Sequence, residues 1–393
     1  MRRTNSYAAV TKDAAQRSKW TFQEAVFFGG DVSRPIHGGN IRKVQDNYGL
    51  DKSTILDFSA SISPFGPPRG VKEVIKKSID ALPNYPDSDC LELRQAIAEY
   101  WEIDPDNLLV GNGSTELIHL ITRVLTPKQA LIPIPTFTEY EDAVRLAGGR
   151  CLFIKARPDK DFSWPMETIL GRLDQADILF LCTPNSPTGY LMPEADIYNI
   201  IHACKKHKIV LVIDETFLDF VDGGGQRSFV NLAARPSNII VLRSFTKLYA
   251  LPGLRLGYLV GGKTLVRKLS RMQPPWMVNA LAQAAGLEAL KDRPYATQTV
   301  VQLNLEKEWL IAELSKTPGL LPYPSAANFI LCRIATKKID SEALTDEMAH
   351  KGILIRNCST YQGLDKHFIR VAVRTREENA RLISSLREVL NGL

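Results

Sequence analysis

The chain has 393 residues, of which 45% are hydrophobic and 23% are charged, and its formal net charge is +6. This composition is typical of a globular protein with a sizeable core, and no run approaches the roughly 18 apolar residues that a membrane-spanning helix requires. Lysine and arginine are interleaved with aspartate and glutamate, so the mild positive charge suits an anionic substrate and does not indicate nucleic-acid binding.

Short β-branched runs alternate with longer helical patterns, which predicts an α/β fold with a mainly parallel sheet. Several of these runs end in polar residues, and the carboxyl edge of such a sheet is where ligands bind. The predicted strands are Leu108–Gly111, Ala130–Ile134, Arg150–Lys155, Ile178–Cys182, Ile209–Asp214, Ile239–Ser244 and Arg255–Val260.

The second half of the chain changes pattern after residue 267, where mainly helical segments precede the strand-like runs NFILCRI, ILIR and HFIRVAV. This predicts a second, smaller α+β domain. We expect an N-terminal extension at 1–36, a segment at 37–78 that packs with the small domain, a large domain at 79–290 and the small domain at 291–393.

The cysteines and the N-terminal residues indicate the cellular compartment. The six cysteines form no CxxC pair and have no metal-ligand spacing with the six histidines, which predicts reduced thiols and no metal site. The first 20 residues lack an apolar signal core, and Asp13 and Glu24 argue against a transit peptide. We therefore expect a cytoplasmic protein that does not associate with membranes.

Four short motifs carry candidate chemistry, in this order along the chain: GNGSTE at 111–116, NSPTG at 185–189, Asp214-Glu215, and SFTK at 244–247 followed by Arg255 and Gly257. Glycines at a helix start suit a phosphate, and a desolvated lysine near another cation suits covalent catalysis. Taken singly, each motif is equally typical of a helix cap, a turn or a surface charge.

Taken together, the four motifs resemble the class I/II aminotransferases that use pyridoxal 5'-phosphate, over nearly all of the chain after His37. The resemblance implies the aspartate-aminotransferase fold, which is fold type I of the pyridoxal-phosphate enzymes, and a Schiff base between the cofactor and Lys247. It also implies that Asp214 pairs with the pyridine nitrogen and that Asn185 binds the ring oxygen.

The same resemblance assigns the remaining cofactor contacts. Phe137 stacks on the ring, although it also suits simple packing, and Phe217 replaces a tyrosine of many relatives. Tyr85 reaches the cofactor phosphate from a neighbouring subunit, which implies a homodimer with shared active sites. The residues implied at the phosphate of the same subunit are Gly113, Ser114, Thr115, Ser244 and Arg255.

Three further stretches narrow the resemblance to the threonine-phosphate decarboxylases of cobamide biosynthesis: HGGN at 37–40, PPWMVNALAQAAG at 274–286 and 353–379. The next resemblance is to histidinol-phosphate aminotransferases, which share the ending RTREEN. The implied substrate is a small phosphorylated amino acid. By this resemblance Arg356 and Arg370 bind its carboxylate and phosphate, in an order left open, and His37 assists at the phosphate.

One segment departs from the resemblance. SASISP at 59–64 has Ser61 and Ser63 where the decarboxylases tend to carry asparagines. Shorter side chains there would alter the substrate pocket and admit O-phosphoserine as well as O-phosphothreonine. The alternatives are an aminotransferase of the histidinol-phosphate type and a paralogue that binds the cofactor without catalysis.

Overall fold

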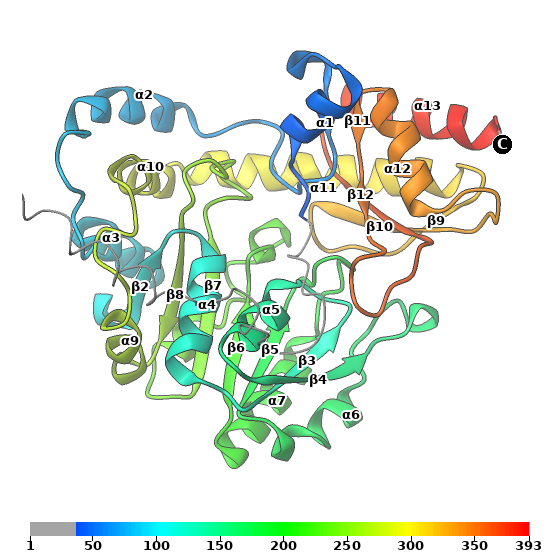
Figure 1. The fold of residues 1–393 in the computed structure, drawn as a ribbon. Helices are drawn as coiled ribbons and strands as arrows, with labels where there is room; N and C mark the ends of the chain where they lie inside the picture. The colour runs from blue at the N-terminus through cyan, green and yellow to red at the C-terminus, as the bar shows by residue number, and fades with distance from the viewer. Residues whose placement is uncertain (1–36, 393) are drawn as a thin grey trace, which may run out of the picture. The chain divides into compact units, whose positions relative to one another are not determined.

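A seven-stranded, mostly parallel sheet lies at the centre of the computed structural model, which describes residues 37–392 (Figure 1). Its strand order is β2-β8-β7-β6-β5-β3-β4, and β8 runs in the direction opposite to the other six strands. The predicted α/β class is confirmed. The strands are β2 (Leu108–Gly111), β3 (Gln129–Ile134), β4 (Arg150–Lys155), β5 (Ile178–Cys182), β6 (Val210–Asp214), β7 (Ile239–Ser244) and β8 (Gly257–Gly261).

The sheet is buried on both faces, which explains why its strands read as nearly continuous apolar runs. Along β6, Leu211 and Ile213 join one hydrophobic cluster, whereas Val212 joins the other. The cluster around Val212 includes side chains of α4, α5 and α9, and the other includes side chains of α3, α7 and α8.

Helices fill most of the chain between the strands. The α-helices are α1 (Ile41–Tyr48), α2 (Arg69–Ser78), α3 (Leu91–Trp101), α4 (Ser114–Leu125), α5 (Glu139–Leu146), α6 (Met166–Leu170), α7 (Glu194–His207), α8 (Val230–Ala233), α9 (Lys263–Ser270), α10 (Ala280–Lys291), α11 (Arg293–Ser315), α12 (Ser341–His350) and α13 (Arg376–Asn391). Short 3-10 turns are η1 (Lys52–Thr54), η2 (Ile79–Ala81), η3 (Pro105–Asn107), η4 (Pro158–Lys160), η5 (Leu173–Gln175) and η6 (Leu218–Phe220). None of the helices within residues 37–392 is long and apolar enough to cross a membrane.

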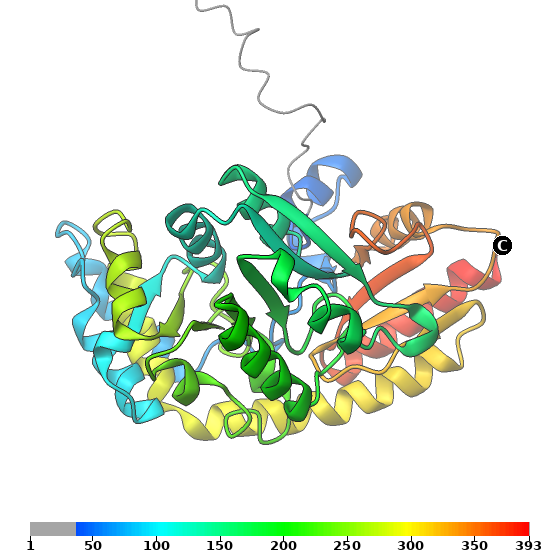
Figure 2. The ribbon, with the colours of Figure 1, turned by 90° about the horizontal axis from the view of Figure 1, so that it is seen from below.

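The C-terminal part has an antiparallel sheet of its own, in the order β12-β13-β10-β9. The long helix α11 contacts β9, β10 and α13 here and η6 beside the large sheet, and Figure 2 shows it running along both parts. Helix α13 begins at a capping box between Thr375 and Glu378, which explains part of the RTREEN motif as a helix start. The strands are β9 (Leu320–Pro322), β10 (Phe329–Ile334), β12 (Arg356–Asn357) and β13 (Phe368–Ala372).

The segment at 37–78 contacts both parts of the protein. Strand β1 (Leu56–Asp57) pairs in parallel with β11 (Ile353–Leu354), and α1 contacts α12, but α2 packs against α10. The boundary expected at residue 290 falls in the last turn of α10, shortly before α11 begins. The expected extension at 1–36 lies outside the described residues.

Two predicted strands differ from those observed by more than a one-residue shift at either end. The run ILIR is two short strands in different sheets, because β11 pairs with β1 whereas β12 turns to pair with β13. The strand expected from Arg255 begins at Gly257, since Arg255 has a φ of 57°, in the left-handed region that ends an extended strand.

Candidate active site

Three of the four motifs meet at one edge of the large sheet. Gly111 lies opposite Gly257, and Gly257 lies opposite Ser244, so three adjacent strand ends hold these residues side by side. Asp214 ends β6 two strands from β8, directly opposite Cys182 of β5. Register alone therefore gathers the motif residues into one site, as expected for the ligand-binding edge of an α/β sheet.

The N-terminus of α4 and Arg255 form one side of this site. Gly113 precedes α4 with a φ of 87°, and a Cβ at this position would overlap the Arg255 guanidinium. The positive φ favours glycine at this position, and a larger residue would also require the Arg255 side chain to move. Ser114 and Thr115 start the helix, and the Ser244 hydroxyl lies 2.8 Å from the Thr246 hydroxyl. The amides of a helix N-terminus, hydroxyls and a guanidinium together suit a phosphate.

Lys247 lies among aromatic and cationic groups. Its Nζ is 5.6 Å from the centre of the Phe217 ring, and its backbone carbonyl accepts a hydrogen bond from the Ser63 amide. Desolvation lowers the pKa of Lys247 to about 8, with help from the positive charges of Arg370 and Arg255. A lysine with this pKa supplies the neutral amine that covalent catalysis needs near neutral pH.

Asp214 is a buried carboxylate with neutral donors. Its side chain accepts hydrogen bonds from the Tyr140 hydroxyl at 2.7 Å and from the Thr216 amide at 3.0 Å. Desolvation raises the pKa of Asp214, although these hydrogen bonds and the charge of Lys247 act to lower it. Each carboxylate oxygen can still accept another hydrogen bond, so the geometry suits a cationic N–H partner such as a protonated ring nitrogen.

Asn185 is buried between loops, and its amide is already engaged. Its nitrogen donates to the Pro135 carbonyl and to the Thr188 hydroxyl, and its oxygen accepts from the Thr136 hydroxyl. Because both amide hydrogens are donated, a bond to a cofactor ring oxygen requires one of these contacts to be exchanged. Phe137, the predicted stacking residue, follows Thr136 and packs edge-on against Tyr140.

Arg356 and Arg370 face each other as a cross-strand pair on β12 and β13 and are 5% and 7% exposed. Arg370 donates to the Ser186 hydroxyl at 2.9 Å and to the Ser59 carbonyl at 3.0 Å. Its positive charge also affects the pKa of Lys247 more than any other charge does. The two predicted substrate arginines are therefore adjacent, and one of them lies close to the predicted cofactor lysine.

The SASISP segment contacts both Arg370 and Lys247. Ser59 binds Arg370 through its carbonyl, and the Ser63 amide binds the backbone of Lys247. Ser61 and Ser63 are buried, with 1% and 4% of their surface exposed. Their hydroxyls have no hydrogen-bond partner among the described residues. Buried hydroxyls of this kind favour a polar ligand that completes their hydrogen bonds.

Two further predicted residues, Tyr85 and His37, contact aromatic side chains. Tyr85 is 79% exposed and stacks on Trp276, with ring centres 4.5 Å apart. His37 contacts Glu139 and lies 5.9 Å from the Phe137 ring. The cavity of about 400 Å³ between α3 and α9 contains none of the predicted site residues.

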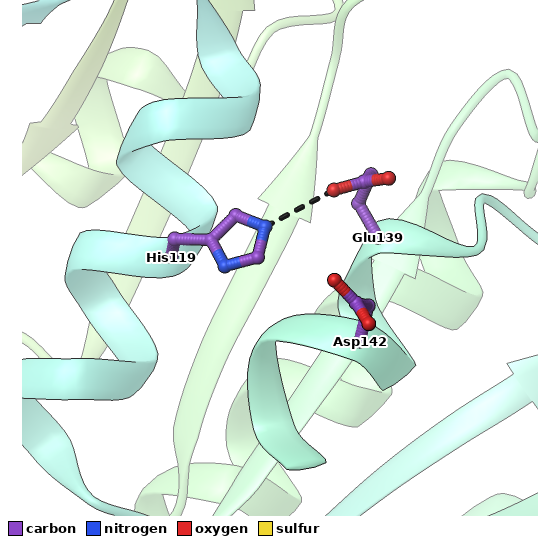
Figure 3. A group of neighbouring side chains, drawn as sticks. All are labelled: His119, Glu139 and Asp142. Carbon is purple, nitrogen blue, oxygen red and sulfur yellow. Dashed lines mark hydrogen bonds and ion pairs between the residues drawn. The ribbon is translucent and has the colours of Figure 1, made fainter. Parts of the chain in front are cut away.

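Sequence reasoning missed Tyr140 and Glu139, although both belong to the PTFTEY motif that contains Phe137. Their positions two and three residues after the predicted ring-stacking residue were the available signal. Glu139 also belongs to a group with His119 and Asp142, whose potential ligand atoms all lie within 4.8 Å of one another (Figure 3). Both Glu139 oxygens already accept hydrogen bonds from histidines.

Comparison with known families decides the assignment. The family model for aminotransferases of class I and II matches residues 53–386. The chain belongs to this family. The resemblance inferred from the four motifs and the aspartate-aminotransferase fold are thereby confirmed.

Individual relatives point to two activities. The chain is 39% identical to the threonine-phosphate decarboxylase of Salmonella typhimurium, over 91% of this chain and 97% of that protein. The solved structure of the histidinol-phosphate aminotransferase from Clostridium acetobutylicum is 30% identical with a TM-score of 0.80, covering 86% of this chain and all of that one. A histidinol-phosphate aminotransferase from Sinorhizobium meliloti, solved with pyridoxal 5'-phosphate, is 23% identical with a TM-score of 0.82, covering 92% and 96%.

Proposed function

We propose that this family member uses pyridoxal 5'-phosphate to decarboxylate an O-phosphorylated amino acid. The substrates are O-phospho-L-threonine, which gives aminopropanol phosphate, and O-phospho-L-serine, which gives ethanolamine phosphate for cobamide biosynthesis. The observation that carries the proposal is the buried cross-strand pair of Arg356 and Arg370, of which Arg370 acts electrostatically on Lys247, since two such cations match a substrate with two anionic groups.

The cofactor is pyridoxal 5'-phosphate, and the residues present fit it. The phosphate would lie at Gly113, Ser114, Thr115, Ser244 and Arg255, where a helix N-terminus and a guanidinium meet. Asp214 would accept the ring N–H, and Lys247 would hold the aldehyde carbon. When bound, the cofactor supplies an electron sink for the bond that breaks at the substrate α-carbon.

The arginines would orient the substrate. Arg370 binds neutral oxygens of Ser186 and Ser59 within the described part of the chain, so its charge is available to an anion. Arg356 lies opposite it and packs on the Tyr361 ring. Fixing both anionic groups would hold the bond between the α-carbon and the carboxylate in one orientation relative to Lys247. This orientation would favour decarboxylation over loss of the α-proton.

Lys247 would act as the proton donor. Its Nζ carries a removable proton near neutral pH because its pKa is about 8. After carbon dioxide leaves, the α-carbon needs a proton. The family resemblance places Lys247 next to that carbon, so Lys247 is the acid that would supply the proton. Asp214 would maintain the positive charge on the ring nitrogen throughout.

Ser61 and Ser63 support a pocket that accepts both phosphoamino acids. Both hydroxyls are buried, and they belong to a segment whose Ser63 amide binds the Lys247 carbonyl and whose Ser59 carbonyl binds Arg370. Their short side chains replace the asparagines of the resembling decarboxylases, which changes the shape and hydrogen bonding of the pocket wall.

A cytoplasmic homodimer is part of the proposal. Tyr85 is exposed beside Trp276 and would complete the phosphate site of a second subunit. Mixing Tyr85→Ala and Lys247→Ala subunits should restore up to about a quarter of the activity, because one site of each hybrid regains both residues. Two inactive parents that stay inactive after verified subunit exchange would refute the shared site.

The deciding experiment is carbon dioxide release from O-phosphothreonine and O-phosphoserine by the purified holoenzyme, with histidinol phosphate plus 2-oxoglutarate in parallel. We expect release from at least one phosphoamino acid and no glutamate. Glutamate without carbon dioxide would support the aminotransferase that the 30% identical structure suggests. Neither product, with the cofactor bound, would support a non-catalytic paralogue.

A further inference from the structure

Glu139 lies between two histidines from separate parts of the chain. Its Oε1 is 2.7 Å from His37 Nε2, and its Oε2 is 3.0 Å from His119 Nε2. Figure 3 shows His119 pointing from α4 toward Glu139 at the start of α5. Because an ionised carboxylate only accepts hydrogen bonds, each histidine donates through Nε2.

The hydrogen bonds from the two histidines favour the ionised form of the Glu139 carboxylate. Its side chain is 10% exposed, and hydrogen bonds from His119 and His37 lower the pKa of Glu139 to about 2. With one histidine on each oxygen, the carboxylate cannot rotate without breaking a charge-assisted bond. Glu139 is therefore a fixed anionic acceptor for the Nε2–H group of His37.

His37 is connected to the candidate site on two sides. Its ring lies 5.9 Å from the ring of Phe137, two residues before Glu139. Gly38 packs directly against the Ser59 carbonyl, and that carbonyl accepts a hydrogen bond from Arg370. Gly38 of the HGGN segment and Arg370 of the buried arginine pair thus contact the same residue, Ser59.

We propose that Glu139 is a positioning residue, which holds His37 through Nε2–H so that the other ring nitrogen, Nδ1, is presented to the substrate phosphate. A phosphate is an acceptor, so His37 would bind it as an imidazolium that donates from Nδ1. His119 stabilises the arrangement by occupying the second oxygen. This inference rests on the proposed function, since the phosphate belongs to the proposed substrate.

The alternative use of this cluster is a metal site at His119, Glu139 and Asp142. The hydrogen bonds favour positioning, because a metal on Glu139 and His119 would displace the Nε2 proton that now joins them. The two roles differ in what they require of Asp142. Positioning does not use its carboxylate, whereas a three-ligand metal site does.

The test is a double-mutant cycle on the holoenzyme with the phosphoamino acid that it decarboxylates. Glu139→Gln should raise KM about 10-fold and change kcat less than about 3-fold, because a charge-assisted bond to a binding residue is lost. In a His37→Gln background the same substitution should change KM less than about 2-fold. Asp142→Asn, with the same loss of charge on the same helix, should leave KM unchanged.

Several results would overturn the proposal: an equal rise of KM in both backgrounds, a fall in kcat at constant KM, or a rise of KM in Asp142→Asn. If Glu139→Gln fails to fold, His119→Gln replaces it in the cycle and should raise KM about 3-fold only when His37 is present. If the protein does not decarboxylate, inorganic phosphate binding is measured from the cofactor absorbance with the same variants. Weaker binding in Glu139→Gln would then support positioning while the proposed function fails.

Discussion

The pKa of Lys247 gives a prediction that connects burial to chemistry. Lowering this pKa from 10.5 to about 8 raises the neutral fraction of the amine at pH 7 roughly 300-fold, to about one-tenth. Only the neutral amine attacks the cofactor aldehyde, so capture of pyridoxal phosphate by the apoenzyme should accelerate through pH 8. The rate should level off above roughly pH 9, where the amine is almost fully deprotonated.

Stopped-flow absorbance of the apoenzyme mixed with the cofactor between pH 7 and 10 measures this midpoint. Two substitutions should move it in opposite directions, because Arg370 lowers the pKa of Lys247 whereas Asp214 raises it. Arg370→Gln should therefore shift the midpoint to higher pH, and Asp214→Asn to lower pH. A capture rate that keeps rising to pH 10 would refute the desolvated amine, and midpoints that do not move would refute the roles of the two charges.

Three further predictions concern single residues. Asp214→Asn should lower the decarboxylation rate at least about 100-fold, because the ring nitrogen loses its anionic partner; a rate within about 3-fold of the parent would contradict this role. Arg243→Met should lower the free energy of unfolding in urea by about 3–5 kcal/mol, because it removes the cation that forms an ion pair with the fully buried Glu215. A loss below about 1 kcal/mol would show that this ion pair is not needed for stability. Ser61→Asn and Ser63→Asn should change the ratio of kcat/KM for O-phosphothreonine to that for O-phosphoserine; an equal decline for both substrates would argue against a role in specificity.

Local sequence patterns predicted most of the large sheet. Strands β2, β4, β5 and β7 have the predicted bounds, because short β-branched runs between turn residues depend little on distant parts of the chain. The errors occur where tertiary contacts or backbone conformation intervene. Arg255 takes a left-handed conformation beside Gly113, and residues 353–357 divide between two sheets, and neither feature has a local signal.

The sequence by itself determined the fold class, the family and the motif residues, since motif order and apolar runs are properties of the chain alone. Only the tertiary structure decided which side chains touch. Tyr140 binds Asp214 across 74 residues, His37 binds Glu139 across 102, and Arg370 binds the Ser59 carbonyl across 311. Such contacts depend on how strands and loops converge at one sheet edge, and burial at that edge is what lowers the pKa of Lys247.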